Sequence, residues 1–306
     1  MTIVITPGSF DDLRSRQVRL LEEAAKLGEL QVLLWSDEVA RRLEGKALKF
    51  PEAERQYLVD AVRYVNRVAL VTELDSPEDL KGLPGIPAGV GASVAGNVSG
   101  PPITWAVDET DDTPAKRAFC AARGLTYRVF TTSDLAGFPG GWDQGAGGRD
   151  RVPAGRSQEA AADGPSPVAG RPSVLVTGCY DWLHSGHVRF FEEVSELGDL
   201  YVAVGNDANV RHLKGAGHPL QSQEERCYMV GAIRYVTQAL LTSGHGWMDA
   251  EPEIERLRPD MYAVNEDGDV PEKRAFCQAH GLTYVVLKRT PKAGLSKRSS
   301  TELRGF

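Results

Sequence analysis

Two histidines three residues apart, His184 and His187, are the residues of this chain with the clearest capacity for chemistry. The stretch before them, VLVTG at 174–178, is typical of a buried parallel strand that a glycine ends. A strand that leads through a glycine turn into a helix favours an anion, because backbone N–H groups are free there and the helix dipole is positive. Two imidazoles on one helix face can then bond the bridging oxygen of a triphosphate and stabilise the charge that builds as that bond breaks.

The tetrapeptide HSGH at 184–187 also resembles a known signature. Preceded by a strand, a glycine, an aromatic residue and an aspartate, it is similar to the HxGH motif of the nucleotidylyltransferase superfamily. Members include cytidylyltransferases for ethanolamine phosphate and glycerol 3-phosphate, and adenylyltransferases for heptose phosphate, nicotinamide mononucleotide and phosphopantetheine. The resemblance implies that the loop and helix start bind the nucleotide through Gly178, Cys179, Tyr180, Asp181 and Gly186.

Two blocks further along fit the same superfamily. Lys214 follows the next predicted strand by about ten residues, where a lysine of the superfamily contacts the phosphates. A solvated loop lysine is the alternative. Glu225-Arg226 followed by the tripeptide RYV at 234–236 resembles the cytidylyltransferase pattern in which ER precedes RYVD, with Thr237 replacing the aspartate. This implies that Arg234 binds the nucleotide or the acceptor phosphate, and a partly structural role is the alternative.

The C-terminal stretch carries two overlapping patterns. Arg289-Thr290 with the tripeptide GLS at 294–296 resembles the RTxGIS block of cytidylyltransferases, and SSTELR at 299–304 resembles the SSTxxR block of adenylyltransferases. Both imply that a helix start and an arginine bind the triphosphate. Ser299 and Glu302 also fit a capping box, but the surrounding basic residues favour phosphate binding. The predicted residues are Arg289, Ser299, Ser300, Thr301 and Arg304.

An acidic segment follows the predicted strand DMYAV. Asn265, Glu266 and Asp267 stand at its carboxyl end, which in the superfamily lies near the base and the sugar. These side chains could accept bonds from a base amino group, bind an amine of the acceptor, or be solvated. Glu109 matches Glu266 in an earlier part of the chain, which is equally consistent with a structural role.

The chain is a tandem duplication. Residues 8–43 align with residues 178–213 at a constant offset of 170, and KRAFC at 116–120 recurs at 273–277. Strands and helices alternate in each copy, which predicts an α/β fold of two tandem Rossmann-like domains, each a doubly wound parallel sheet. The expected boundaries are a first domain at 1–133, a Gly/Pro-rich linker at 134–172 and a catalytic domain at 173–306.

The first copy lacks the candidate catalytic residues of the second. Arg14 and Gln17 replace the two histidines, Arg16 replaces Gly186, and Glu44 reverses the charge of Lys214. We therefore expect a degenerate cytidylyltransferase-like domain that is inactive. It could pack against the second copy, complete the acceptor pocket or supply a dimer face, so both a monomer with an internal pseudo-dimer and a homodimer are consistent with the sequence.

Composition narrows the class of protein. The net charge of −7 argues against nucleic-acid binding and against an anionic membrane surface. No apolar run approaches the about 20 residues that span a bilayer, and the N-terminus does not resemble a secretory signal. The 4 cysteines are sparse, as in a cytoplasmic protein with reduced thiols.

The predicted function is transfer of CMP from CTP to the phosphate or phosphonate of a small acceptor, with release of pyrophosphate. Mg²⁺, bound mainly through the triphosphate and not by a defined protein ligand set, is the expected cofactor. The tandem layout and IRYV resemble the ethanolamine-phosphate cytidylyltransferases and so favour CTP, whereas the SSTxxR ending favours the alternative, adenylyl transfer from ATP to a sugar phosphate or a similar acceptor. A non-catalytic nucleotide-binding regulatory protein or scaffold is a further alternative. A zinc site of Cys179, His184 and His187 fits the downstream residues less well.

Overall fold

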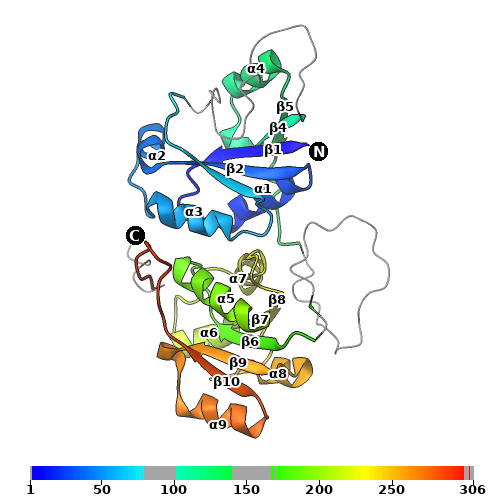
Figure 1. Cartoon of the computed structure of the whole chain (residues 1–306), viewed down its shortest axis with the longest axis vertical. Helices are drawn as coiled ribbons and strands as arrows, with labels where there is room; N and C mark the ends of the chain where they lie inside the picture. Colours follow the sequence, from blue (N-terminus) through cyan, green and yellow to red (C-terminus); the bar gives the residue numbers. More distant parts are fainter. Residues whose placement is uncertain are drawn as a thin grey trace, which may run out of the picture. The chain divides into compact units, whose positions relative to one another are not determined.

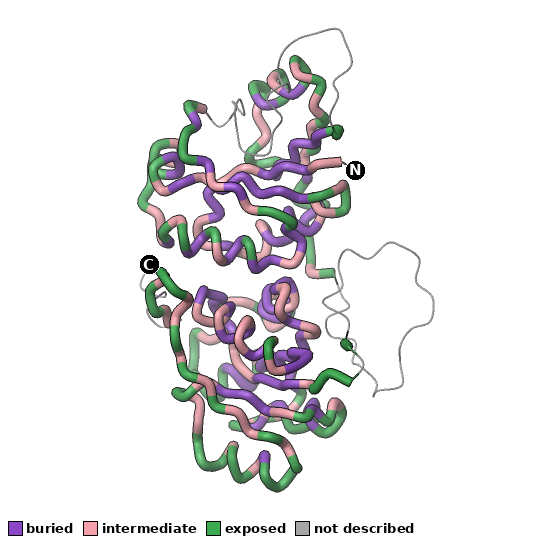
Figure 2. The backbone as a smooth tube through the Cα atoms, in the orientation of Figure 1, coloured by how far each residue is buried: buried purple, intermediate pink, exposed green. Residues whose placement is uncertain are grey.

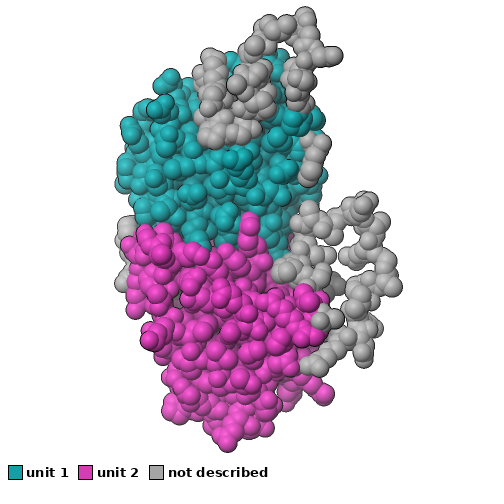
Figure 3. Space-filling model, viewed as in Figure 1, with its two compact units in different colours: residues 1–137 teal, residues 138–306 magenta. Residues whose placement is uncertain are grey.

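The computed structural model describes residues 2–76, 78, 101–139, 167, 168, 170–299 and 303. The chain forms two compact units, Met1–Gly137 and Phe138–Phe306, and each is described by itself (Figures 1 and 3). The first unit ends 4 residues after the expected boundary at 133. The expected linker at 134–172 lies partly outside the described residues.

The first unit is a parallel sheet of 5 strands in the order β3-β2-β1-β4-β5. Its strands are β1 Ile3–Gly8, β2 Glu29–Trp35, β3 Arg67–Val71, β4 Ile103–Asp108 and β5 Thr126–Phe130. Its helices are α1 Ser15–Ala25, α2 Asp37–Glu44, α3 Glu52–Asp60 and α4 Pro114–Arg123, with a 3₁₀ turn, η1, at Glu109–Asp111.

The second unit repeats this topology as β10-β9-β6-β7-β8, again with parallel pairing. Its strands are β6 Ser173–Gly178, β7 Asp199–Val204, β8 Gln238–Leu241, β9 Met261–Asn265 and β10 Thr283–Leu287. Its helices are α5 Ser185–Leu197, α6 Asp207–Lys214, α7 Gln223–Gly231, α8 Glu251–Leu257 and α9 Pro271–Ala279, with a 3₁₀ turn, η2, at Glu266–Gly268. The prediction of two tandem Rossmann-like units is therefore confirmed.

The strand order reverses at the central strand of each sheet, β1 and β6, because the chain adds strands first on one side and then on the other. Ligands of such sheets bind outside the carboxyl ends of the strands at this point. The central strand is apolar because both faces are covered: Val174, Leu175 and Val176 are fully buried, and Figure 2 shows the inner strands of the unit largely as buried. Among the described residues, no helix is long and apolar enough to cross a membrane.

A buried arginine fixes the loop that follows the central strand. Arg226 on α7 is 0% exposed, and its guanidinium donates to the carbonyls of Cys179 at 2.6 Å and Gly205 at 2.7 Å, and to the carboxylate of Asp207 at 2.7 Å. Its Nε donates to the carbonyl of Gln221 at 3.2 Å. The guanidinium thus joins the ends of β6 and β7 to the start of α7.

The first unit contains the same arrangement. Arg55 is also 0% exposed, and it donates to the carbonyls of Ser9 at 2.5 Å, Trp35 at 2.9 Å and Phe50 at 3.1 Å, and to Asp37 at 2.8 Å. Because both units keep these bonds although their candidate sites differ, the Glu-Arg pair of the sequence pattern has a structural role here.

Arg226→Ala is expected to lower the free energy of unfolding of the second unit by about 3–5 kcal/mol, because the partly buried carboxylate of Asp207 and three carbonyls lose their donor. Arg55→Ala should do the same to the first unit. Urea unfolding of the full chain measures both effects. Arg211→Ala on the exposed face of α6 is the control and should change stability by less than about 0.5 kcal/mol. A similarly small change in Arg226→Ala would contradict the structural role.

Candidate functional site

The loop after β6 is held in a conformation that only certain residues allow. Tyr180 has a left-handed backbone with φ of 53°, and its ring lies where a side chain on Gly178 would be, 2.6 Å from the position of a Cβ atom. The buried ring contacts His187 edge-on, with centroids 5.2 Å apart. The Tyr180 ring therefore packs against His187, and Gly178 has no side chain that would displace this ring. Phe10, with φ of 48°, occupies the matching position of the first unit.

The two histidines form a stacked pair at the start of α5, in which His184 is buried and His187 is partly buried. His184 is the N-cap residue, is 0% exposed, and accepts the Gly186 N–H through Nδ1 at 3.1 Å. The rings of His184 and His187 are 3.9 Å apart and nearly parallel. Nε2 of His184 is buried and has no hydrogen-bond partner among the described residues, whereas His187 has a hydrogen bond with the Trp182 backbone. Buried polar atoms are rarely left unpaired, so Nε2 of His184 is the ring nitrogen that a ligand could bond.

Both imidazoles are neutral at pH 7. Burial, and then the charges of Arg289 and Arg298, lower the pKa of His184 to about 3. Burial lowers the pKa of His187 well below its usual range, and His184, Arg289 and Lys214 lower it further. Because Nδ1 of His184 accepts a bond, the neutral ring carries its proton on Nε2 and can donate it to an oxygen. The pair thus supplies hydrogen bonds in a field that Lys214 and Arg289 make positive.

The C-terminal segment crosses the start of α5. A Cβ atom on Gly186 would lie 3.6 Å from the carbonyl oxygen of Arg298, and that oxygen accepts a hydrogen bond from Arg289 at 2.9 Å. Arg289 also pairs with Asp267. A pocket at this crossing is lined by the first two turns of α5, by the end of β9 and by the C-terminal segment, with basic side chains from Arg189, Lys288, Arg289, Lys292, Lys297 and Arg298.

The structure brings several predicted residues together here. The histidine pair, Gly186 and Arg289 meet at the start of α5, and Asn265 lines the adjoining pocket. The Leu303 N–H donates to the Ser299 carbonyl at 3.3 Å, which is the spacing of a helical turn. Ser300, Thr301 and Arg304 lie outside the described residues. Lys214 is the exposed last residue of α6, and its charge reaches His187.

Two of the predicted site carboxylates accept backbone N–H groups, and so do the matching carboxylates of the first unit. One oxygen of Asp181 accepts the N–H groups of Leu220 at 2.6 Å and Gln221 at 3.1 Å. Asp11 accepts two backbone N–H groups in the same way. Glu266 accepts the Arg289 N–H at 3.3 Å, and Glu109 accepts the Thr132 N–H at 2.9 Å. These bonds fix loops, and they account for the retention of both carboxylates in the first unit.

Of the remaining predicted residues, Arg234 is separated from the histidine pair. Arg234 lies in the turn between α7 and β8, at the amino end of a strand that runs parallel to β6 and β7. The histidine pair follows the carboxyl end of β6, so the two lie at opposite edges of the sheet. Cys179 uses its carbonyl to accept from Arg226. Asp267 pairs with Arg289, and its carboxylate is half exposed.

The start of α1 in the first unit matches the start of α5, and side chains of the first unit occupy the space there. Arg16, which replaces Gly186, donates to both oxygens of Asp108 at 2.5 and 2.8 Å. Asp108 stands where the second unit has Asn265. The pair places a guanidinium at the helix start where an anion would bind. Reasoning from the sequence did not predict that Asp108 pairs with Arg16. The available signal was a carboxylate at the end of one predicted strand and an arginine at the start of the first predicted helix.

Lowering the pH from 7.5 to 5 is expected to destabilise the second unit. The folded pair excludes protons that unfolded histidines take up, so stability is lost as the pH falls below about 6.5 toward the folded pKa, by up to about 1.4 kcal/mol per pH unit for each histidine. His187→Gln, which introduces the residue type found at Gln17, should remove about half of this dependence. Urea unfolding at several pH values measures it, and equal pH slopes for the two proteins would contradict the assignment.

Comparison with known proteins agrees with this geometry. A family model described as cytidylyltransferase-like matches residues 175–305. FAD synthases of Archaeoglobus profundus and Ferroglobus placidus are 35% and 37% identical over 133 residues, which cover 42% of this chain and 82% and 84% of those proteins. The bifunctional protein HldE of Syntrophotalea carbinolica is 33% identical over 99 residues, which cover 32% of this chain and 20% of that protein. The chain belongs to the cytidylyltransferase-like family of the nucleotidylyltransferase superfamily.

Proposed function

We propose that the second unit transfers a nucleoside monophosphate from a nucleoside triphosphate to the phosphate or phosphonate of a small acceptor and releases pyrophosphate. The observation that carries this proposal is the neutral histidine pair at the start of α5. In it, the buried Nε2 of His184 has no partner among the described residues, and the charges of Lys214 and Arg289 lie nearby.

In this proposal the acceptor oxygen attacks the α-phosphorus in line. A new P–O bond forms while the bond from the α-phosphorus to the bridging oxygen breaks, and that electron pair leaves with pyrophosphate. The acceptor is already anionic at neutral pH, so no general base and no covalent enzyme intermediate are needed. Nε2–H of His184 and the ring of His187 stabilise the oxygens whose charge rises during transfer, and their burial strengthens these bonds.

The cations around the pair hold the rest of the triphosphate. Lys214 and Arg289 bind the β- and γ-phosphates, together with the backbone at Ser299. Arg289 already bonds the Arg298 carbonyl and Asp267. A triphosphate oxygen can replace the bond to Asp267, because that carboxylate is half exposed and returns to water when released.

The site fits a Mg²⁺ ion that is held mainly by the triphosphate. Of the carboxylates near the loop, Asp181 accepts two backbone N–H groups and Asp207 accepts from buried Arg226, so both have structural partners. Triphosphate oxygens and water are then the main ligands, which suits an ion that keeps much of its hydration. When bound, the ion would neutralise the charge of the triphosphate.

The nucleotide is ATP or CTP. The tandem layout and the IRYV pattern favour CTP. The names of the relatives favour ATP, because FAD contains an adenylyl group joined to the phosphate of FMN. An FMN-like phosphate monoester is therefore a candidate acceptor beside phosphorylated amino alcohols, sugar phosphates and phosphonates.

We propose that the first unit does not catalyse. The Arg16–Asp108 pair fills its helix start, and Arg14 pairs with Asp12 instead of facing a ligand. A regulatory protein that binds nucleotide without turnover is the second candidate function.

The test is pyrophosphate release from ATP and from CTP in Mg²⁺ against a panel of such acceptors. We expect turnover with one pair, and a fall of at least about 10²- to 10³-fold in His187→Ala. His212→Ala on the exposed end of α6 is the control and should leave the rate unchanged. Nucleotide binding without pyrophosphate release would favour the regulatory function, and near wild-type turnover in His187→Ala would overturn the assignment.

A further inference from the structure

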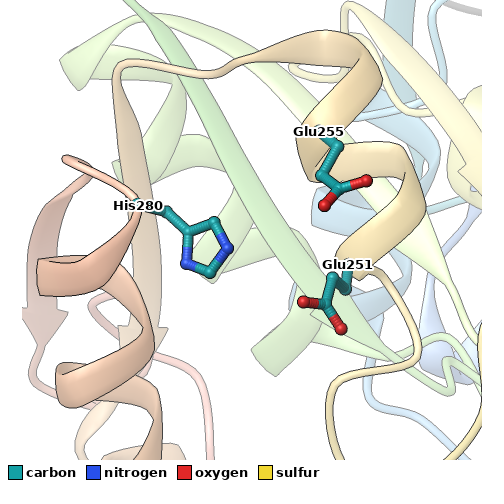
Figure 4. Close-up of side chains that lie close together, drawn as sticks. All are labelled: Glu251, Glu255 and His280. Atoms are coloured by element: carbon teal, nitrogen blue, oxygen red, sulfur yellow. The ribbon is translucent and has the colours of Figure 1, made fainter.

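A second group of metal-ligating side chains lies between α8 and α9. Glu251 and Glu255 stand one turn apart on α8, and His280 follows the last residue of α9 (Figure 4). One ligand atom from each of the three side chains lies within 4.8 Å of the other two. Ligands on a tetrahedral ion with bonds of about 2.1 Å lie about 3.4 Å apart, so small rotations of these exposed side chains would close the group around one ion.

The imidazole of His280 is already oriented as a metal ligand. Its Nδ1 lies 2.9 Å from the carbonyl oxygen of Phe276, and a carbonyl can only accept, so Nδ1 carries the proton. The ring also stacks on the ring of Phe276, with centroids 3.9 Å apart. The lone pair is therefore on Nε2. A histidine ligand whose other nitrogen donates to a backbone carbonyl is the usual arrangement in metal sites.

The two carboxylates carry uncompensated charge. No ion pair among the described residues involves Glu251 or Glu255, whereas most acidic side chains of α5 and of η2 are paired. Like charges four residues apart on a helix repel each other, which destabilises the helix in the absence of a cation. A divalent ion would remove this repulsion and add a link between the two helices.

The first unit lacks this group. Arg123 occupies the position that matches His280, and it makes the same two contacts with the preceding phenylalanine: its guanidinium lies 3.6 Å from the ring centroid of Phe119 and donates to the Phe119 carbonyl at 3.5 Å. Packing at this corner is thus satisfied by arginine, so packing alone does not require the imidazole of the second unit.

We propose that Glu251, Glu255 and His280 bind one divalent transition-metal ion, with Zn²⁺ as the best fit. Two carboxylate oxygens and one imidazole nitrogen suit Zn²⁺ better than Mg²⁺, which prefers oxygen ligands and water. All three side chains are exposed, so water completes the coordination. The ion joins α8 to α9, which together cover one face of the sheet through Ile254, Phe276 and Cys277.

The test is calorimetric titration of Zn²⁺ into the chelator-treated, nucleotide-free full chain, together with thermal unfolding. We expect one Zn²⁺ per chain at this group and a Zn²⁺-dependent rise in the unfolding temperature. His280→Arg, which introduces the side chain that the first unit tolerates, should weaken this binding by at least about tenfold and abolish the rise.

Two further variants make the result specific. The double variant Glu251→Gln, Glu255→Gln should lose the same binding event, and it tests the group independently if His280→Arg does not fold. His187→Ala is the control for metal held by the histidine pair and should keep the event. Absence of binding in the wild-type chain, or unchanged binding in His280→Arg or in the double variant, would overturn the proposal.

Discussion

A fully buried guanidinium is the interaction on which each unit depends. Arg226 and Arg55 each gather carbonyls from the ends of two central strands, and each is neutralised by one aspartate. Removing a cation from water is costly, so the arrangement is stable only while every donor keeps its partner. This requirement fixes the loop after the central strand, and with it the direction in which the next helix begins. The position of His184 follows from this packing.

The histidine pair destabilises the fold in acid, whereas the buried arginine stabilises it. Stacking the two imidazoles at the helix start leaves the buried Nε2 of His184 unpaired and lowers the pKa of both rings, which weakens the fold in acid but provides a donor that water does not compete for. At the same place the first unit has a hydrogen-bonded ion pair between Arg16 and Asp108, which satisfies its own groups. The same scaffold therefore has a buried, unpaired ring nitrogen at the helix start of the second unit and a satisfied ion pair at the helix start of the first.

The sequence predicted what depends on local pattern. The strand–glycine–helix stretch, the duplication and the alternation of elements led to the fold, and the basic C-terminal segment was expected beside His184. Contacts between distant residues were not predictable, because spacing along the chain does not say which strand ends are neighbours. Asp267 beside Arg289, Arg16 on Asp108 and the approach of Glu251 to His280 all depend on strand order. The backbone bonds of Asp181 and Glu266 were equally hidden, since a carboxylate that fixes a loop looks the same in sequence as one that binds a ligand.

The pairing of Arg16 with Asp108 also has an evolutionary consequence. Asp108 is 7% exposed, and although burial alone would raise its pKa, hydrogen bonds from Arg16 and Thr110 outweigh burial and keep the pKa low. Restoring glycine at position 16 by a single mutation would leave this carboxylate without its main counter-charge, at the very spot where phosphate must approach. The first step back toward an open site would thus reduce both stability and anion binding. Once such a pair forms, the duplicated unit is held in its new state by its own electrostatics, and selection can reshape its surface for other purposes.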